Sequence, residues 1–299
     1  MAPVGFLGLG RMGLAIAGRL SVAGVPLQLW NRSWRDSMDA VLSDWATRVD
    51  TAAEALASPI SFSMLADDDA AEAVLSRVNL GTSEHARVHV NMASLSVRMG
   101  ELLTRRCEEA GIVYVAAPVL GRPEVAVAGN LNVLLAGPSP ALNEVEPLLA
   151  LFSKGRWPLG EVPRQANAVK IAMNFMLLHA LESMGEGIAL VEAEGVSADA
   201  FVDIFTNTFF GGMVHSIYGG MIAERRYSPA GFSMALGLKD LSLAEQLAAE
   251  SKIDVATAPV LRDRFETALA DPELADLDWS AIAEISRSQG SEGSPSPGR

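Results

Sequence analysis

The sequence predicts an α/β protein with an N-terminal doubly wound parallel sheet of the Rossmann type, a long interdomain helix and an all-α C-terminal domain. Three observations predict this fold. Short apolar runs alternate with amphipathic segments up to about residue 160, and a glycine-rich turn follows the first run. Residues 164–194 then keep an apolar helical period without a strong breaker, and the segments after them also have helical patterns.

The first half has the order of elements expected of a parallel sheet. Apolar runs interpreted as strands are 3–9, 26–30, 60–65, 88–92, 113–118 and 131–137. Amphipathic segments interpreted as the helices between them are 12–23, 36–46, 68–77, 96–110 and 141–153. Alternation of this kind places helices on both faces of the sheet, and six strands match a dinucleotide-binding domain.

The second half is predicted to hang from one long helix over 164–194. Thirty helical residues span about 45 Å, which is too long to fold back on one small domain. Gly195 is expected to end this helix and Ser197 to cap the next. Further helices are expected at about 198–207, 211–225, 232–250, 256–270 and 278–286.

These patterns divide the chain into three parts. We expect an NADP-binding Rossmann domain over 1–162 and a helical substrate and oligomerisation domain over 163–287. Residues 288–299 are rich in serine, glycine and proline and are expected to be a flexible tail.

Composition excludes several classes of protein. The net charge of −13 argues against a nucleic-acid surface. Glycines and Arg11 interrupt the first apolar run, and no run is long enough to span a bilayer, so a reduced, cytoplasmic setting is expected. The only cysteine, Cys107, excludes an internal disulfide and is interpreted as structural; no metal-ligand cluster is expected.

The glycine-rich turn predicts a nucleotide site. Gly8, Gly10 and Gly13 have the spacing G-x-G-x-x-G between a strand and a helix, with Arg11 and Met12 in the same turn. Cofactor phosphates would meet the free N–H groups and the positive end of the helix dipole there. The alternative is a packing turn that binds no ligand.

The end of the second strand indicates which cofactor binds. NAD sites place an acidic residue there, whereas NADP sites place an arginine. This chain has Asn31, Arg32 and Ser33, with Arg35 close behind. A guanidinium can bind the 2′-phosphate that a carboxylate would repel, so NADP(H) is predicted; a solvated surface arginine is the alternative.

Seven motifs in order resemble the β-hydroxyacid dehydrogenase family over about residues 3–270. The family includes 3-hydroxyisobutyrate dehydrogenase, tartronate semialdehyde reductase and glyoxylate/succinic semialdehyde reductase. WNRS is most similar to the NADPH-using reductases. The motifs are GFLGLGRMG, WNRS, SMLADDDA (63–70), VNMASLS (90–96), APVLGRPEVAVAGNLNVLLAG (117–137), NAVKIAMN (167–174) and GLKDLSLA (237–244).

The resemblance implies a catalytic lysine. In the family, the lysine of a K-x-x-x-N element is the acid/base; here it is Lys170, with Asn174 as the asparagine. The i, i+4 spacing puts both on one helical face. Apolar neighbours would lower the pKa of the lysine toward a range useful for proton transfer. A lysine that snorkels from a helix edge is the alternative.

The resemblance also implies residues around the cofactor and substrate. Lys239 would lie near the nicotinamide ribose with Asp240 supporting it, and Ser94 near the nicotinamide and substrate. Further implied contacts are Met64 and Leu65 near the adenosine ribose and Phe232 at the substrate.

The substrate loop departs from the family's usual APVSGG. Leu120 replaces the serine and Arg122 the final glycine, while Gly121 remains. Arg122 could bind an acid through two hydrogen bonds, or it could point at solvent or the cofactor phosphate. Leu120 could line an apolar pocket. Residues 205–221 could line the pocket, the core or a subunit interface, and His215 is either a second acid or a structural residue.

These features predict an NADPH-dependent reductase of a small aldehyde or keto acid, with the proton from Lys170. The nearest alternative is an imine reductase. Those enzymes usually carry aspartate or tyrosine where this chain has Lys170, but an imine needs no carboxylate clamp and Leu120 would suit it. A non-catalytic NADPH-binding protein is the second alternative. By analogy with the family, we expect a homodimer or homotetramer through the helical domain.

Overall fold

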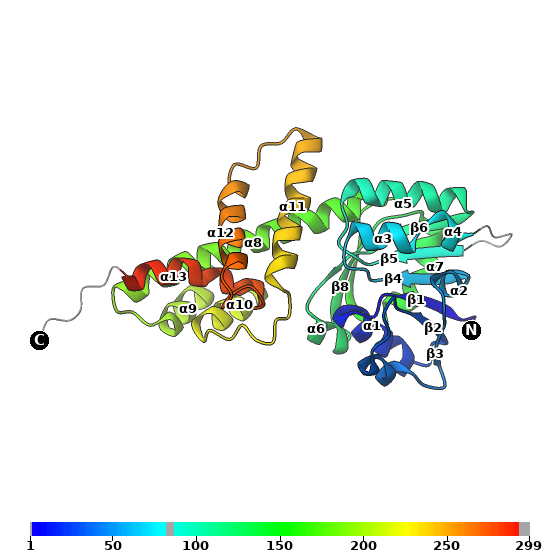
Figure 1. Cartoon of the computed structure of the whole chain (residues 1–299), viewed down its shortest axis with the longest axis horizontal. Coiled ribbons are helices and arrows are strands. Elements are labelled where there is room, and N and C mark those ends of the chain that lie inside the picture. Colours follow the sequence, from blue (N-terminus) through cyan, green and yellow to red (C-terminus); the bar gives the residue numbers. More distant parts are fainter. Residues whose placement is uncertain (1, 82–86, 293–299) are drawn as a thin grey trace, which may run out of the picture. The chain divides into compact units, whose positions relative to one another are not determined.

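The computed structural model describes residues 2–81 and 87–292 and forms two compact units, Met1–Ile171 and Ala172–Arg299 (Figure 1). The division falls inside one helix, α8 (Arg164–Ala193), which is the long helix expected over 164–194. The boundary expected at 162–163 lies just before this helix. Each unit has its own apolar core.

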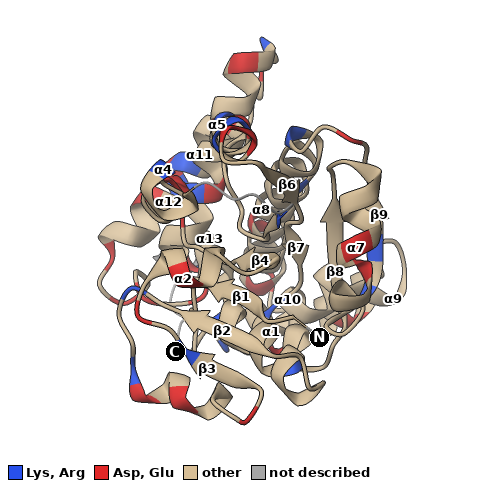
Figure 2. Ribbon diagram, turned by 90° about the vertical axis from the view of Figure 1, so that its right-hand side faces the viewer, with Lys and Arg blue, Asp and Glu red and all other residues tan. Residues whose placement is uncertain are grey.

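The first unit contains a parallel sheet of six strands in the order β3-β2-β1-β4-β5-β6. Figure 2 shows β3, β2, β1 and β4 side by side. The order reverses between β1 and β4, which is the position where dinucleotides bind in this architecture, so the predicted Rossmann fold is confirmed. The strands are β1 (Val4–Leu7), β2 (Leu27–Trp30), β3 (Ala46–Arg48), β4 (Ile60–Ser63), β5 (Arg87–Asn91) and β6 (Ile112–Ala116).

The sixth predicted strand does not belong to this sheet. Residues 131–135 form β8 (Leu131–Leu135) in a second sheet, antiparallel to β7 (Val119–Leu120) and parallel to β9 (Ser153–Pro158). The sixth strand of the main sheet is instead β3, which lies at one edge, next to β2. The segment 36–46 was expected to be a helix, but only the 3₁₀ helix η1 (Asp36–Val41) forms there. With three residues, β3 is too short to show a period in the sequence.

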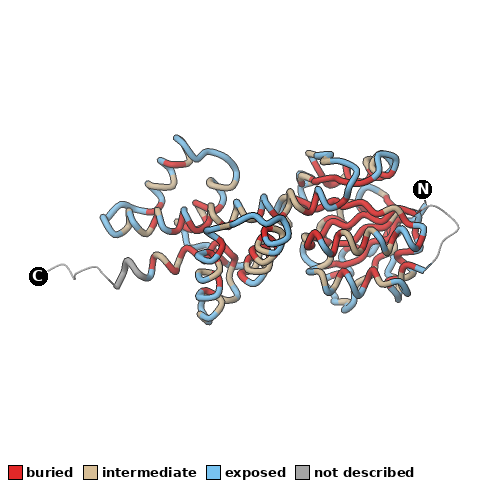
Figure 3. The backbone as a smooth tube through the Cα atoms, turned by 90° about the horizontal axis from the view of Figure 1, so that it is seen from above, coloured by how far each residue is buried: buried red, intermediate tan, exposed pale blue. Residues whose placement is uncertain are grey.

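Two apolar clusters cover the two faces of the main sheet, and buried residues follow its strands (Figure 3). Cys107 lies in the second cluster, where burial raises the pKa of its thiol to about 12 and keeps it protonated. One face is covered by α1 (Arg11–Val22) and α7 (Ser139–Leu149), and the other by α2 (Ala52–Leu56), α3 (Asp68–Val74) and α5 (Val97–Glu109). Shorter helices are α4 (Arg77–Leu80) and α6 (Pro123–Val127).

The second unit is helical, as predicted. Gly195 has a φ of +81°, and the Ser197 hydroxyl accepts the N–H of Ala200 at 3.3 Å, which confirms the stop and restart after α8. The last helix continues through residues 288–292 of the expected tail, and 293–299 lie outside the described residues. After α8 come α9 (Ala198–Asn207), α10 (Met213–Ala223), α11 (Met234–Ser251), α12 (Ala258–Ala270), η2 (Trp279–Ile282) and α13 (Ala283–Glu292). None of the helices in the described part of the chain is long and apolar enough to cross a membrane.

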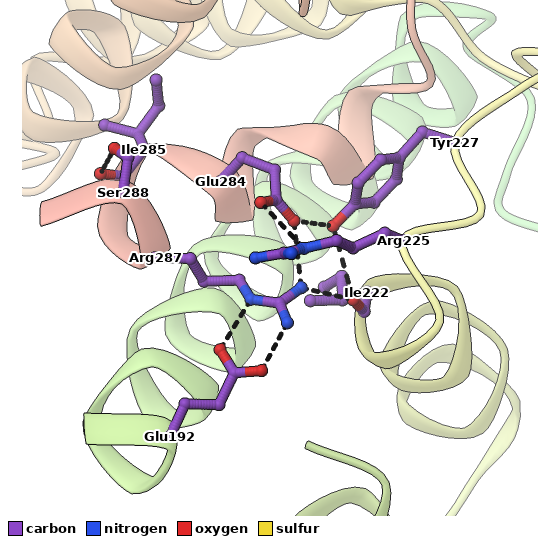
Figure 4. Close-up of polar contacts among 8 residues, drawn as sticks. All are labelled: Glu192, Ile222, Arg225, Tyr227, Glu284, Ile285, Arg287 and Ser288. Carbon is purple, nitrogen blue, oxygen red and sulfur yellow. Dashed lines mark hydrogen bonds and ion pairs between the residues drawn. The ribbon is translucent and has the colours of Figure 1, made fainter. Parts of the chain in front are cut away.

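A buried ion network joins the ends of this helical unit (Figure 4). The Arg287 side chain is 4% exposed and donates to both carboxylate oxygens of Glu192, to the carbonyl of Ile222 at 2.8 Å and to Glu284 at 3.0 Å. The Tyr227 hydroxyl donates to the same Glu284 at 2.6 Å. The network connects α8, α10 and α13, because each nitrogen of the guanidinium donates to an acceptor on another turn or helix.

Candidate active site

The glycine-rich turn lies at the carboxyl end of β1, before α1. Gly8 has a φ of +92°, and a Cβ there would lie 2.4 Å from the carbonyl oxygen of Met64. A Cβ at Gly13 would lie 2.0 Å from the carbonyl oxygen of Gly8. A Cβ at Gly10, in contrast, would meet nothing within 4 Å. The backbone is therefore closely packed at Gly8 and Gly13 and open at Gly10, beside the N-terminus of α1. A phosphate bound to the first N–H groups of the helix requires such an opening.

Asn31 ties the end of β2 to this turn. Its side-chain oxygen accepts the N–H of Leu9 at 2.8 Å, and its amide nitrogen donates to the carbonyl of Ser33 at 2.7 Å. Arg32 and Ser33 are exposed directly beyond it. The residues proposed for the adenosine ribose and its phosphate thus lie beside the open end of α1, and Asn31 fixes their backbone.

Besides Arg32, a second cationic side chain, that of Arg48, lies near the segment that follows β2. The Arg48 guanidinium, from the short strand β3, lies 5.0 Å from the ring centroid of Trp34, whose indole N–H donates to Asp39 at 2.8 Å. Sequence reasoning did not include Arg48, because a three-residue strand gives no periodic signal.

Met64 and Leu65 follow β4 and are half-buried. The N–H of Met64 donates to the carbonyl of Leu7 at 2.9 Å, which extends the pairing of β4 with β1. Because Gly8 approaches Met64 closely, these residues form one wall of the glycine turn, at the carboxyl edge of the sheet.

Ser94 lies half-buried in the loop after β5, and this loop is held at both ends. The Asn91 side chain accepts the N–H of Ala93 at 2.8 Å. Asp68, at the start of α3, accepts the N–H of Ser96 at 3.0 Å and its hydroxyl at 2.5 Å. Sequence reasoning missed Asp68 as a support of this loop; the run of three aspartates at 67–69 was its only signal.

The predicted substrate loop, residues 117–123, contains the short strand β7. Leu120 packs against the apolar cluster on the α5 face of the main sheet. Gly121 has a φ of +141°, and a Cβ there would lie 2.7 Å from Cδ2 of Leu131. The family glycine kept at this position is therefore required by the backbone and by its neighbour.

Arg122 faces a carboxylate in its own unit. Its Nε lies 3.8 Å from Oε2 of Glu124, and Oε1 of Glu124 lies 3.9 Å from Nη2 of Arg11. Glu124 therefore lies between a cation of the substrate loop and a cation of the glycine turn. Sequence reasoning missed Glu124, because the pairing with Arg11 joins segments far apart in the chain.

Asn174 is held by a buried carboxylate in the helical unit. It lies one helical turn after the half-buried Lys170 on α8 and is 3% exposed. Its Nδ2 donates to Oδ2 of Asp240, which is 1% exposed. Oδ1 of Asp240 lies 3.1 Å from Nζ of Lys239. One carboxylate on α11 thus orients the amide of α8 and holds the neighbouring ammonium.

Phe232 lies in an aromatic cluster. Its ring centroid is 4.4 Å from that of Trp279, and its N–H donates at 3.1 Å to the fully buried Asp278. His215 lies against two aromatic rings, 6.2 Å from Phe205 and 5.6 Å from Phe210 between centroids.

Among the described residues, no group of three His, Cys, Asp or Glu side chains could hold a metal ion.

Comparisons with known proteins agree with this architecture. Residues 3–166 match the family model for the NAD-binding domain of 6-phosphogluconate dehydrogenase, and residues 165–286 match the model described as NAD-binding of NADP-dependent 3-hydroxyisobutyrate dehydrogenase. The chain is 35% identical over 283 residues to the uncharacterized oxidoreductase YfjR of Bacillus subtilis, covering 93% of this chain and 98% of that protein. It is 29% identical over 289 residues to 2-hydroxy-3-oxopropionate reductase of Escherichia coli, covering 94% and 96%.

A solved structure shows the same fold. The 3-hydroxyisobutyrate dehydrogenase of Mycobacterium tuberculosis, solved with L-serine, superposes with a TM-score of 0.83 at 23% identity, over 96% of this chain and 99% of that one. Both halves of the chain therefore agree with one family. The chain belongs to the β-hydroxyacid dehydrogenase family of NAD(P)-dependent oxidoreductases.

Proposed function

We propose that this protein is an NADPH-dependent reductase that converts a small aldehyde or keto acid into the corresponding hydroxy compound. The observation that carries the proposal is the pair of Lys170 and Asn174 on α8, with the amide of Asn174 oriented by the buried carboxylate of Asp240. The E. coli relative named for 2-hydroxy-3-oxopropionate supports the substrate class.

The side chains suit proton transfer to a carbonyl oxygen. A bound nicotinamide cofactor supplies the hydride for the carbonyl carbon. Lys170 donates a proton to the carbonyl oxygen, where negative charge develops, and regains a proton from water. Because Nδ2 of Asn174 donates to Asp240, its Oδ1 is the atom that accepts from an ammonium or a substrate hydroxyl. In the oxidative direction Lys170 acts as the base.

The cofactor would be held by the turn described above. Gly8, Gly10 and Gly13, with the first N–H groups of α1, suit the pyrophosphate, since Gly10 leaves the helix end open. Arg32 and Ser33, held beyond Asn31, suit a 2′-phosphate. Within the helical unit, Lys239 suits a hydroxyl of the nicotinamide ribose, because its ammonium is held by Asp240.

The proposal is tested by turnover with purified protein. NADPH or NADH is mixed with glyoxylate, succinic semialdehyde, 2-hydroxy-3-oxopropionate or the cyclic imine 1-pyrroline, and loss of reduced cofactor is followed by absorbance. We expect carbonyl reduction with NADPH. Reduction of the imine alone would instead support an imine reductase. NADPH binding without turnover of any compound would support a non-catalytic binding protein.

Lys170→Ala tests the assigned proton donor. We expect a loss of about 10²–10⁴-fold in kcat with unchanged NADPH affinity, because general acid catalysis contributes factors of that size. Lys154→Ala, which removes an exposed lysine from β9, is the matched control and should change neither quantity. Equal turnover of the Lys170 and Lys154 variants would contradict the assignment.

The proposal also includes a reduced cytoplasmic setting and association of two or four copies through the helical domain. Association would cover apolar side chains that this unit exposes, which supports it: Met176 is 67%, Leu190 72%, Phe209 92% and Met213 58% exposed. Analytical ultracentrifugation at micromolar concentration tests it, and a monomer would refute it.

A further inference from the structure

The substrate loop and the glycine turn share one acidic side chain. Each oxygen of the Glu124 carboxylate faces a different guanidinium, Oε2 toward Arg122 at 3.8 Å and Oε1 toward Arg11 at 3.9 Å. All three residues belong to the first unit. Arg11 is the first residue of α1 and Arg122 immediately precedes α6, so the contact joins two loops that are far apart in sequence.

The exposure of these side chains differs. The Arg122 side chain is 20% exposed, whereas that of Glu124 is 67% exposed. Most of the Arg122 side chain is therefore buried, whereas the Glu124 carboxylate can be replaced with little effect on the core. A negative charge about 4 Å from a guanidinium opposes the approach of a second anion, and the opposition is limited by solvent screening.

This arrangement bears on which substrates the loop can bind. Arg122 replaces a glycine of the usual family loop, and a guanidinium there suits a carboxylate of the substrate. Glu124 offsets that charge, and the neighbouring Leu120 contributes no polar group. The loop is thus less attractive to an anionic substrate than Arg122 alone would make it.

We propose that Glu124 is a specificity-determining residue that lowers the affinity of this loop for carboxylate substrates relative to neutral ones. It does so because its negative charge offsets the positive charge of Arg122. The inference rests on the proposed function for the assignment of this loop to the substrate. Through Arg11, the same carboxylate lowers the affinity for the cofactor phosphates. Glu124 acts through the two arginines and takes no part in proton or hydride transfer.

The test measures binding of two unreactive probes of the same shape. Isobutyrate carries a carboxylate and isobutyramide is its neutral analogue, and neither has a carbonyl group that the proposed reaction reduces. Each is titrated by calorimetry into the protein saturated with NADPH. In Glu124→Gln we expect isobutyrate affinity to rise about threefold to fivefold, the upper part of the range for exposed charge pairs, and isobutyramide affinity to stay unchanged. The gain should shrink in 1 M NaCl, where screening acts within about 3 Å.

Two further variants isolate the cause. Glu109→Gln removes a carboxylate of the same unit that pairs with Arg77 at 2.7 Å, and it should leave both affinities unchanged. Glu124→Gln combined with Arg122→Ala should bind isobutyrate no better than Arg122→Ala alone. A gain that persists without Arg122, an equal gain for isobutyramide, or no isobutyrate binding to Glu124→Gln would each overturn the proposal.

The binding result is separate from the proposed reaction. If no carbonyl compound is turned over but Glu124→Gln binds isobutyrate more tightly, the reductase proposal fails and the charge-offset role stands. If carbonyl compounds are reduced but the variant shows no gain, the role of Glu124 fails alone. With turnover, the variant should lower KM for glyoxylate about threefold to fivefold, with unchanged kcat and unchanged KM for isobutyraldehyde.

Discussion

Replacing Asp240 by asparagine removes a charge that holds two residues of the candidate site, Asn174 and Lys239. Its carboxylate accepts from Asn174 and pairs with Lys239 at 3.1 Å while only 1% exposed. Asparagine keeps the shape but leaves the lysine without this charge. Hydrogen bonds to charged groups contribute about 1.5–3 kcal/mol, and the 24% exposure of the Lys239 side chain reduces the cost through hydration. We expect a loss of about 2 kcal/mol in the free energy of unfolding.

Two measurements separate the structural and the catalytic effect of Asp240→Asn. At about 3 °C per kcal/mol, Tm should fall by about 6 °C. A misoriented Asn174 should lower kcat by about 10–100-fold, because small displacements of positioning groups have effects of that size. Glu245→Gln is the control: it changes a residue on the same helix as Asp240 and breaks a partly exposed pair with Arg262 of α12. It should cost about 1 kcal/mol or less without lowering kcat.

The double variant Asp240→Asn with Asn174→Ala decides how the carboxylate acts. If Asp240 works by orienting Asn174, the double variant should lose little more activity than Asn174→Ala alone, because both remove the same interaction. Fully multiplicative losses, or a kcat of Asp240→Asn within twofold of the unmodified protein despite the fall in Tm, would refute the reasoning.

Three further predictions concern the first unit. Arg32→Ala should weaken NADPH binding by about tenfold or more and NADH binding by less than twofold, since it removes a charged partner of the 2′-phosphate alone; equal losses in calorimetry would contradict this. Gly10→Ala should lower NADPH affinity without changing Tm, because its Cβ meets nothing within 4 Å, whereas Gly13→Ala should lower Tm, because its Cβ would lie 2.0 Å from a carbonyl oxygen. Burial lowers the pKa of His89 to about 3, whereas an exposed imidazole titrates near 6.5, so the unfolded chain binds the extra proton between these values. The free energy of unfolding should therefore fall on acidification from about pH 6.5 toward 3, by up to about 1.4 kcal/mol per pH unit from this group, and His89→Gln should remove that contribution; identical pH dependence of denaturant unfolding would contradict it.

Much of the fold was predictable from local patterns. The helical period of 164–194, the stop at Gly195 and the cap at Ser197 all act within a few residues, and the structure has α8 and α9 at these positions. The sheet was less predictable. The run 131–137 is a strand, but its partners are β7 and β9, because strand membership depends on hydrogen bonds to distant segments.

The candidate site divides in the same way. The spacing of Gly8, Gly10 and Gly13 predicted a turn that the structure forms. The apolar period of 164–194 predicted one helix for Lys170 and Asn174, and their i, i+4 spacing predicted one face of it. The partners of these residues were harder to predict. Asp68 supports the loop that carries Ser94 from a different helix, and no period in the sequence connects them.

The sequence by itself determined the two-part organisation, the glycine turn and the lysine helix, because turn geometry and helical periodicity are properties of neighbouring residues. Tertiary structure alone decided that Asp240 holds Asn174 from 66 residues away and that Glu124 lies between Arg11 and Arg122. Such pairs form only when packing brings distant elements within hydrogen-bonding or ion-pair range. The charge around Arg122 is set by such a pair, and so it was decided by the packing of the loops.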